Sequence, residues 1–329
     1  MKPTFSAAFW SYDRTQPIET GLVELEGCEI NHFNLNPEEM FQRAIFHEEF
    51  DITELSLSHY LTHHSRGQSP YIAVPVFPAR MFRHSAIYVN RTRLGGKPQD
   101  LIGRRIGVPQ YAATAAVWVR GFLADDFGIK PTDVDWVTGA LEEKGPRATR
   151  DRHLPESIRL SYADPQQTLS EMLLDGSIDA LVSPRAPSCY VERDARVGRL
   201  FEDYAEVEMD YFRRTGIFPI MHVMAIKKST LEQHPWLAMS VVKAWEKARR
   251  IAQENLFVQR VPIIMLPWVS EYARKAISIM GPNFWPYGLD ENRDVLEAFL
   301  RYHNEQGLSS ERLSVEMLFA PSTLEIVKI

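Results

Sequence analysis

The chain has 329 residues, of which 45% are hydrophobic, 24% charged and 11% aromatic. This composition excludes an intrinsically disordered chain and provides apolar material for one large or two medium cores. With 37 basic and 43 acidic residues, the formal net charge is −6. A mildly acidic chain without a basic block argues against nucleic acid or an anionic membrane surface as the main partner.

Cysteine content and hydropathy narrow the class of protein further. Cys28 and Cys189 are too few for a disulfide framework or a zinc cage, and free buried thiols are expected. The first ten residues lack the long apolar core of a secretory signal, and no run approaches the roughly 18 apolar residues of a membrane span. We therefore expect a cytoplasmic protein without membrane contact; a homo-oligomer is compatible with this composition.

The first part of the chain alternates predicted strands and helices. A strand over residues 4–10 ends in a polar turn at 11–15. Asn36, followed by Pro37 and Glu39, is typical of a helix start, with Asn as the cap. A short strand at 50–55 leads into 56–60. Further strands are expected at 71–77 and 85–89, where Pro75 and Pro78 indicate an edge or a crossover.

A second unit begins near residue 100. Its predicted elements, in chain order, are a strand at 101–109, a helix at 111–127, a strand at 134–137, a helix from 164–167 to Gly176, and a strand at 178–182. The charged residues 139–157 predict a surface loop. A last strand at 217–226 precedes an almost wholly helical tail. This alternation is typical of an α/β protein with mostly parallel sheets.

The block 100–109, the helix after it and the turn at 174–180 resemble the type II periplasmic-binding-protein fold. The resemblance implies a two-lobed α/β architecture with two crossover strands, a helical C-terminal tail and a ligand cleft between the lobes. We assign residues 1–90 and 222–329 to one lobe and residues 91–221 to the other.

Over nearly its whole length the chain is similar to the 4,5-dihydroxyphthalate decarboxylase family. The matching stretches are residues 10–15, 54–58, 75–80, 82–90, 114–118 and 213–222. Phe82–Ser85 and Gly216–His222 are the most specific of these. Aspartate is usual in the family where Ser11 stands here, and the 139–157 loop varies. The resemblance implies decarboxylation of 4,5-dihydroxyphthalate to 3,4-dihydroxybenzoate.

The chemistry of that reaction defines what the site must contain. Each carboxylate of the substrate lies para to a hydroxyl, and direct loss of CO₂ would leave an unstable aryl carbanion. Protonating the ring carbon that bears the carboxylate avoids this, because the para phenol donates electron density to the ring. The site then needs an acid, a group that polarises the phenol and cations for two carboxylates, but in principle no metal or other cofactor.

Histidine is the natural acid near neutral pH, and two histidines are candidates. His84 lies at the start of the first predicted crossover and His222 in the second, so we expect them to meet across the ligand. For each of them, the alternative is a buried histidine in a strand whose ring nitrogens are hydrogen-bonded within the protein. Asp13 follows the first strand at its carboxyl end, where it can orient a histidine or accept a phenolic proton; the alternative is a turn aspartate that caps its own backbone.

Candidate binding residues are cations, hydroxyls and aromatic rings near predicted strand ends and crossovers. The candidates to bind the substrate carboxylates are Arg14, Arg80, Arg83 and Arg185, and we expect about two of them to touch the ligand. Anion and hydroxyl contacts are predicted from Tyr111 and Thr114 at a helix start, and from Ser56 and Ser58. Ring stacking is assigned to Trp10, Tyr12 and Phe82, although aromatics at strand ends more often belong to the core.

Three alternatives stay open at this point. A metal site at His59, His63 and His64 has helical spacing but no clear fourth ligand, so no metal is predicted. A solute-binding protein that captures an aromatic carboxylate without chemistry would share the fold, as would a decarboxylase of a related hydroxylated acid. Paired histidines and the missing signal segment favour an enzyme whose partner is a small aromatic dicarboxylate.

Overall fold

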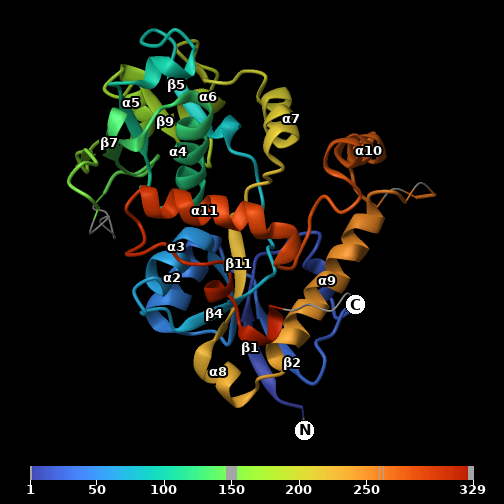
Figure 1. Cartoon of the computed structure of the whole chain (residues 1–329). Coiled ribbons are helices and arrows are strands. Elements are labelled where there is room, and N and C mark those ends of the chain that lie inside the picture. Colours follow the sequence, from blue (N-terminus) through green and yellow to red (C-terminus); the bar gives the residue numbers. More distant parts are fainter. Residues whose placement is uncertain (1, 146–153, 259, 262, 325–329) are drawn as a thin grey trace. The chain divides into compact units, whose positions relative to one another are not determined.

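The computed structural model describes residues 2–145, 154–258, 260–261 and 263–324, and they form two compact lobes (Figure 1). The first lobe comprises the chain up to Arg80, Gly216–Glu297 and the chain from Leu313 onward. The second lobe comprises Met81–Thr215 and Ala298–Arg312. Each lobe contains one sheet, so the chain has the expected α/β character.

These lobes differ from the sequence-based assignment in three segments, residues 81–90, 216–221 and 298–312, of which 216–221 belong to the first lobe. Residues 81–90 belong to the second lobe, because β5 (Ile87–Asn90) pairs with β9 (Ala180–Val182) and β10 (Val197–Arg199). Residues 298–312 belong there too, since they include the later part of α11 (Arg293–Glu305), which packs on α4 (Thr114–Phe127). Such long-range contacts have no local sequence signal.

The sheet of the first lobe has the order β2–β1–β3–β11–β4. Its strands are β1 (Thr4–Ala8), β2 (Glu29–Phe33), β3 (Ile52–Ser56), β4 (Tyr71–Val74) and β11 (His222–Lys227). β1 is parallel to β2 and β3, whereas β11 is antiparallel to both β3 and β4. All five residues of β3 are buried, as expected for a strand covered on both faces.

Helices cover both faces of this sheet. Figure 1 shows α2 and α3 on one side and α9 on the other. The helices of the lobe are α1 (Gln16–Glu19), α2 (Pro37–His47), α3 (Leu57–His64), α8 (Lys228–Gln233), α9 (Leu237–Asn255), α10 (Val269–Met280) and the start of α11. The predicted start of α2 is confirmed, because the Asn36 side chain accepts a hydrogen bond from the Glu38 amide.

The sheet of the second lobe has the order β10–β5–β9–β6–β7–β8. Its strands not yet given are β6 (Arg105–Val108), β7 (Asp135–Thr138) and β8 (Leu160–Tyr162). β6 is parallel to β7 and β9, β7 is parallel to β8, and β5 is antiparallel to β9 and β10. Both lobes therefore have mixed rather than purely parallel sheets.

The helices of the second lobe are α4, α5 (Leu169–Asp175), α6 (Ser188–Val191) and α7 (Tyr204–Thr215). The predicted start of α5 at residues 164–167 is wrong. The helix begins instead at Leu169, after a capping box that Thr168 forms with Glu171. Asp164 accepts a hydrogen bond from the Gln166 amide in a turn that precedes the helix. The predicted end is confirmed, since Gly176 caps the helix in the left-handed conformation with φ 81°.

The described part of the predicted 139–157 loop contains no helix or strand, and residues 146–153 lie outside the described residues.

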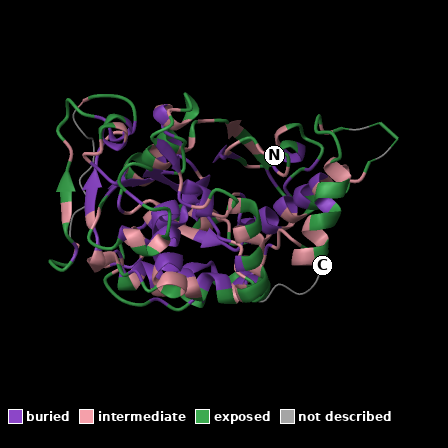
Figure 2. Ribbon diagram, turned by 90° about the horizontal axis from the view of Figure 1, so that it is seen from above, coloured by how far each residue is buried: buried purple, intermediate pink, exposed green. Residues whose placement is uncertain are grey.

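Buried residues gather on the strands and on the helix faces that cover them (Figure 2). Within the described part of the chain, no helix is both long enough and apolar enough to cross a membrane.

The packing of α4 on α11 predicts a destabilising substitution. A Cβ added to Gly121 would lie 2.2 Å from Cδ2 of Tyr302, whose hydroxyl donates to Asp125 Oδ2 at 2.5 Å. The overlap outweighs the helix-propensity gain of about 1 kcal/mol, so Gly121→Ala should lower the free energy of unfolding by about 1–3 kcal/mol in urea titrations. In a Tyr302→Ala background the penalty should vanish; an equal loss in both backgrounds would contradict this packing.

Candidate functional site

A buried carboxylate lies in the sheet of the first lobe. The Glu54 side chain in β3 is 0% exposed, and three groups contact it. The Tyr12 hydroxyl donates to Oε1 at 2.8 Å, the Trp10 amide donates to Oε2 at 3.0 Å, and His222 Nδ1 lies 2.6 Å from Oε1. A carboxylate removed from water requires such partners, so these contacts account for a glutamate at the centre of a sheet.

Strand register brings His222 to Glu54. In the antiparallel pairing of β3 with β11, Ser56 lies opposite His222 and Glu54 opposite Met224. Residues two apart in a strand share a face, so Glu54 and His222 are diagonal neighbours on one face. Because the carboxylate occupies Nδ1, we assign the hydrogen to that nitrogen, which leaves Nε2 to exchange a proton with a ligand.

His222 is accessible while its partner is not. The imidazole is 20% exposed, and the Phe41 ring of α2 packs edge-on against it with centroids 5.0 Å apart. One ring nitrogen is thus fixed by a buried carboxylate and one wall of the ring is aromatic. This arrangement suits a histidine that transfers protons at an apolar site.

Tyr12 contributes a hydrogen-bond donor as well as an aromatic ring. Burial, followed by the neighbouring Glu54 carboxylate, raises the pKa of the Tyr12 phenol far above its ordinary value. The phenol therefore stays protonated and keeps donating to Glu54. Its ring also faces the Arg14 guanidinium, with the carbon of that group 4.1 Å from the ring centroid.

Arg14 is held between two aromatic rings. Its guanidinium carbon lies 4.1 Å from the Tyr12 centroid and 4.2 Å from the Trp285 centroid. Nε donates to the Pro78 carbonyl at 2.5 Å and Nη1 to Asp13 Oδ1 at 2.9 Å, and the side chain is 16% exposed. Cation–π contacts on both faces fix the plane of the group and direct its edge, which is the geometry that a carboxylate recognises.

Asp13, predicted to support a histidine, lies elsewhere. Its side chain is 57% exposed and accepts hydrogen bonds from the backbone amide and Nη1 of Arg14. The carboxylate beside His222 belongs to Glu54 instead.

Ser56 and Ser58 are buried where β3 passes into α3. The Trp10 backbone joins the site through its amide.

Arg80 is buried and bound by acceptors of its own lobe. Its Nη1 donates to the Phe218 carbonyl at 3.0 Å, and Nη2 donates to the Pro286 carbonyl at 2.8 Å and to the Asn292 side chain. Burial lowers the pKa of the guanidinium to about 9. These contacts secure the first crossover segment, where Arg80 and Ile220 form an antiparallel bridge.

His84 lies in the second lobe, and His222 in the first. The imidazole of His84 is 2% exposed, stacks on Phe122 at 4.1 Å and lies with Nδ1 4.0 Å from Glu208 Oε1. Burial lowers the pKa of His84 to about 4, so the ring is neutral at neutral pH. Its surroundings are those of a packed aromatic core, to which Tyr211 and Phe201 also contribute.

The other predicted residues of the second lobe lie before β5, after β6 and after β9. Phe82 meets Phe212 edge-on at 6.4 Å, and burial lowers the pKa of Arg83 to about 10. Tyr111 is fully buried, with the Arg120 guanidinium 3.7 Å from its ring centroid. Thr114 is the buried first residue of α4, and Arg185 is exposed after β9.

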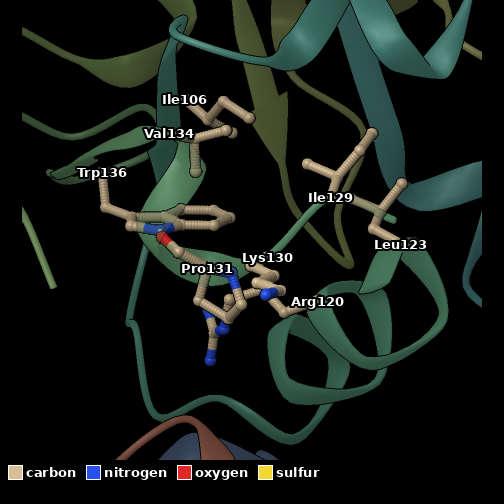
Figure 3. A pocket seen from close by; sticks show the side chains of 8 residues that line it. All are labelled: Ile106, Arg120, Leu123, Ile129, Lys130, Pro131, Val134 and Trp136. Carbon is tan, nitrogen blue, oxygen red and sulfur yellow. The ribbon is translucent and has the colours of Figure 1, made fainter. Parts of the chain in front are cut away.

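A small pocket in the second lobe lies beside Tyr111, because Arg120 and Trp136, which line it, both pack against the Tyr111 ring. None of the predicted site residues is among the eight residues that line it. Figure 3 shows Ile106, Val134 and Trp136 on one side of it and Leu123 and Ile129 on the other. This mostly apolar space lies between α4 and the sheet and lacks an acid for the predicted chemistry.

Among the described residues, no group of three or more His, Cys, Asp and Glu side chains is arranged to hold a metal ion. In the histidine cluster of α3, His64 Nε2 lies 2.8 Å from the Met317 carbonyl, and His63 packs edge-on against Phe46.

Sequence reasoning missed Glu54 and Trp285. For Glu54, a signal was present: a single carboxylate within the otherwise uncharged strand Ile52–Ser56. Such a residue needs a buried partner, although the strand alone does not identify it. Trp285 follows α10 in a segment without regular structure, and no local pattern connects it to Arg14.

Comparison with known proteins decides the family. No family model matches the chain. A 4,5-dihydroxyphthalate decarboxylase of Comamonas testosteroni is 42% identical over 328 residues, which cover 100% of this chain and 99% of that protein. The chain belongs to the 4,5-dihydroxyphthalate decarboxylase family. A 4,5-dihydroxyphthalate decarboxylase of Pseudomonas putida is 43% identical over 212 residues, covering 64% of this chain and 82% of that protein. The family resemblance predicted from sequence is confirmed.

Solved structures support the fold of this decarboxylase family member. The periplasmic aliphatic sulphonate binding protein SsuA of Escherichia coli aligns with a TM-score of 0.54 at 12% identity, over 98% of this chain and 99% of that one. The desulfurization enzyme DszB aligns with a TM-score of 0.52 at 15% identity, over 98% and 97%. The predicted periplasmic-binding-protein-like fold is confirmed.

The environment of His84 predicts a pH-dependent stability. The pKa of His84 falls from 6.5 in the unfolded chain to about 4 in the fold, so the unfolded chain binds more protons between these values. Stability should therefore fall with pH from 6.5 to 4, by at most about 3 kcal/mol. His84→Phe, which keeps a ring against Phe122, should remove this loss in urea titrations at several pH values.

Glu208 supplies a control of opposite sign. Burial raises the pKa of its carboxyl from 4.5 to about 6, so the folded protein binds more protons in that range and gains stability as pH falls. Glu208→Gln should steepen the loss of stability at acid pH, whereas His84→Phe flattens it. Equal pH profiles for the wild type and the His84 variant would contradict the buried, neutral imidazole.

Proposed function

We propose that this protein is a carboxy-lyase that converts 4,5-dihydroxyphthalate into 3,4-dihydroxybenzoate and CO₂ by protonating the ring. The observation that carries the proposal is the pairing of the partly exposed His222 with the buried Glu54, in the same lobe as Arg14, the cation that packs against two aromatic rings. An acid held by a carboxylate and a cation for a substrate carboxylate are both needed for this reaction. Both curated relatives are named 4,5-dihydroxyphthalate decarboxylase.

In the proposed mechanism His222 is the proton donor. As an imidazolium it transfers the Nε2 proton to the ring carbon that bears the leaving carboxylate, while the para hydroxyl donates electron density into the ring. The bond to the carboxylate then breaks, its electron pair restores the aromatic ring, and CO₂ departs. His222 ends neutral and regains a proton from water, so each turnover consumes one proton. Glu54 stabilises the imidazolium through Nδ1.

Charge and burial favour His222 over His84 as the acid. His84 has a pKa of about 4 and is unprotonated at the pH where a neutral-pH acid must carry its proton. His222 combines an accessible ring with a hydrogen bond between Nδ1 and the buried Glu54 carboxylate. Arg14 is the proposed carboxylate ligand of the first lobe.

Substitutions of the pair should affect turnover more than binding. His222→Asn should lower kcat by about 10²–10⁴ with little change in KM, because it removes the transferred proton. Glu54→Gln should lower kcat as well, since a neutral amide stabilises an imidazolium poorly. His84→Phe should keep most of the activity in the same steady-state assay. Near wild-type kcat in the His222 variant, or a large loss only at His84, would overturn the assignment.

The reaction itself is tested with chelator-treated protein and 4,5-dihydroxyphthalate, by following CO₂ release and the aromatic product. Rapid formation of 3,4-dihydroxybenzoate is expected, because no step of the mechanism is assigned to a metal. Tight binding without turnover would instead indicate a solute-binding protein. Turnover of a related hydroxylated acid alone would change the substrate, and activity restored only by a divalent cation would refute the metal-free mechanism.

A further inference from the structure

The segment Trp285–Gly288 is tied to the first crossover within the first lobe. Trp285 Nε1 donates to the Phe77 carbonyl at 3.0 Å, and the Gly288 amide donates to the Pro75 carbonyl at 2.8 Å. Gly288 has φ 90°, a left-handed conformation that favours glycine and turns the chain directly after Tyr287. The segment is therefore fixed in place before any ligand binds.

This segment brings two side chains to Arg14. Trp285 covers one face of the guanidinium at 4.2 Å, and Phe218 packs against the Trp285 ring edge-on at 5.3 Å. Tyr287 follows two residues later, and its phenol lies within electrostatic range of Arg14 and Tyr12. Trp285 and Tyr287 thus belong to the surroundings of the proposed carboxylate ligand.

The Tyr287 hydroxyl is a buried donor in need of an acceptor. Tyr287 is 8% exposed, and its hydroxyl has no hydrogen-bond partner among the described residues. A buried polar group left in this state destabilises a protein by about 1–3 kcal/mol, and native structures retain few of them. A donor that is unsatisfied in the free protein is well suited to a ligand oxygen.

The charges around Tyr287 specify an anionic ligand. Arg14, Arg80 and Arg249 all act electrostatically on the phenol and lower its pKa, against the larger raising effect of burial. Arg249 is neutralised by two hydrogen bonds to Glu246, at 2.9 and 2.7 Å. Arg80 instead contacts neutral acceptors, and the carboxylate that pairs with Arg14 is largely exposed. Positive charge is therefore in excess beside an unsatisfied hydroxyl.

We propose that the Tyr287 hydroxyl and the Arg14 guanidinium together bind the carboxylate that the substrate keeps through the reaction. This rests on the proposed function, in which one of two ortho carboxylates leaves from the ring carbon that His222 protonates. The neighbouring carboxylate must then be held so that this carbon faces His222. A phenol donor and a guanidinium edge on one carboxylate fix its position, and they make the site selective for an ortho-dicarboxylate.

Product binding distinguishes this subsite from one for the departing group, because the single carboxylate of 3,4-dihydroxybenzoate is the retained one. Calorimetry with Tyr287→Phe should give a roughly tenfold higher Kd for 3,4-dihydroxybenzoate than the wild type, and inhibition by catechol, which has no carboxylate, should be unchanged. KM for 4,5-dihydroxyphthalate should rise by a similar factor while kcat stays within a few-fold.

Tyr71→Phe is the matched control in the same lobe, since the buried Tyr71 hydroxyl donates to the Phe50 carbonyl at 2.9 Å. This variant should lose stability and keep its ligand affinity, whereas Tyr287→Phe should be at least as stable as the wild type and lose affinity. Unchanged Kd for 3,4-dihydroxybenzoate in Tyr287→Phe, or no binding to the wild type, would overturn the subsite. A wild type that binds this ligand but does not turn over the substrate would refute the proposed function alone.

Discussion

A carboxylate with no exposed surface constrains the whole first lobe. Glu54 is tolerated in the sheet only because Tyr12, the Trp10 amide and His222 surround it, and these partners come from the turn after β1 and from β11. Satisfying one buried charge thus fixes the path of the chain after β1 and the register of β11. The same contacts leave Nε2 of His222 for the proton transfer of the proposed mechanism.

The cation of the site is fixed by a different principle. Arg14 gains its orientation from two aromatic faces and a backbone carbonyl, so it keeps its charge while losing its conformational freedom. One of these rings, Tyr12, also donates to Glu54. The Tyr12 side chain therefore links the partner of the proposed acid to the cation, and a change at Tyr12 would disturb both the hydrogen bonding of Glu54 and the position of Arg14.

The fold itself leaves the function open. A sulphonate-binding protein and a desulfurization enzyme align with this chain over nearly their full lengths. Binding and catalysis in this architecture must therefore differ in particular side chains. In the proposed function, the difference lies in His222 and the buried Glu54 carboxylate that contacts it. A passive binder of an aromatic acid needs arginines and rings but no such pair.

The sequence by itself determined the local elements and the family: the cap at Asn36, the stop at Gly176 and the stretches shared with decarboxylases depend on neighbouring residues. It also indicated His222, but not its partner. Tertiary structure decided that Glu54 rather than Asp13 meets this histidine, that His84 is packed away from water, and that Arg80 binds backbone carbonyls. Glu54 and His222 are 168 residues apart, and only the pairing of β3 with β11 brings them together. Which side chains are buried, and which groups they contact, depends on packing between segments that are distant in sequence. The local order of residues does not specify that packing.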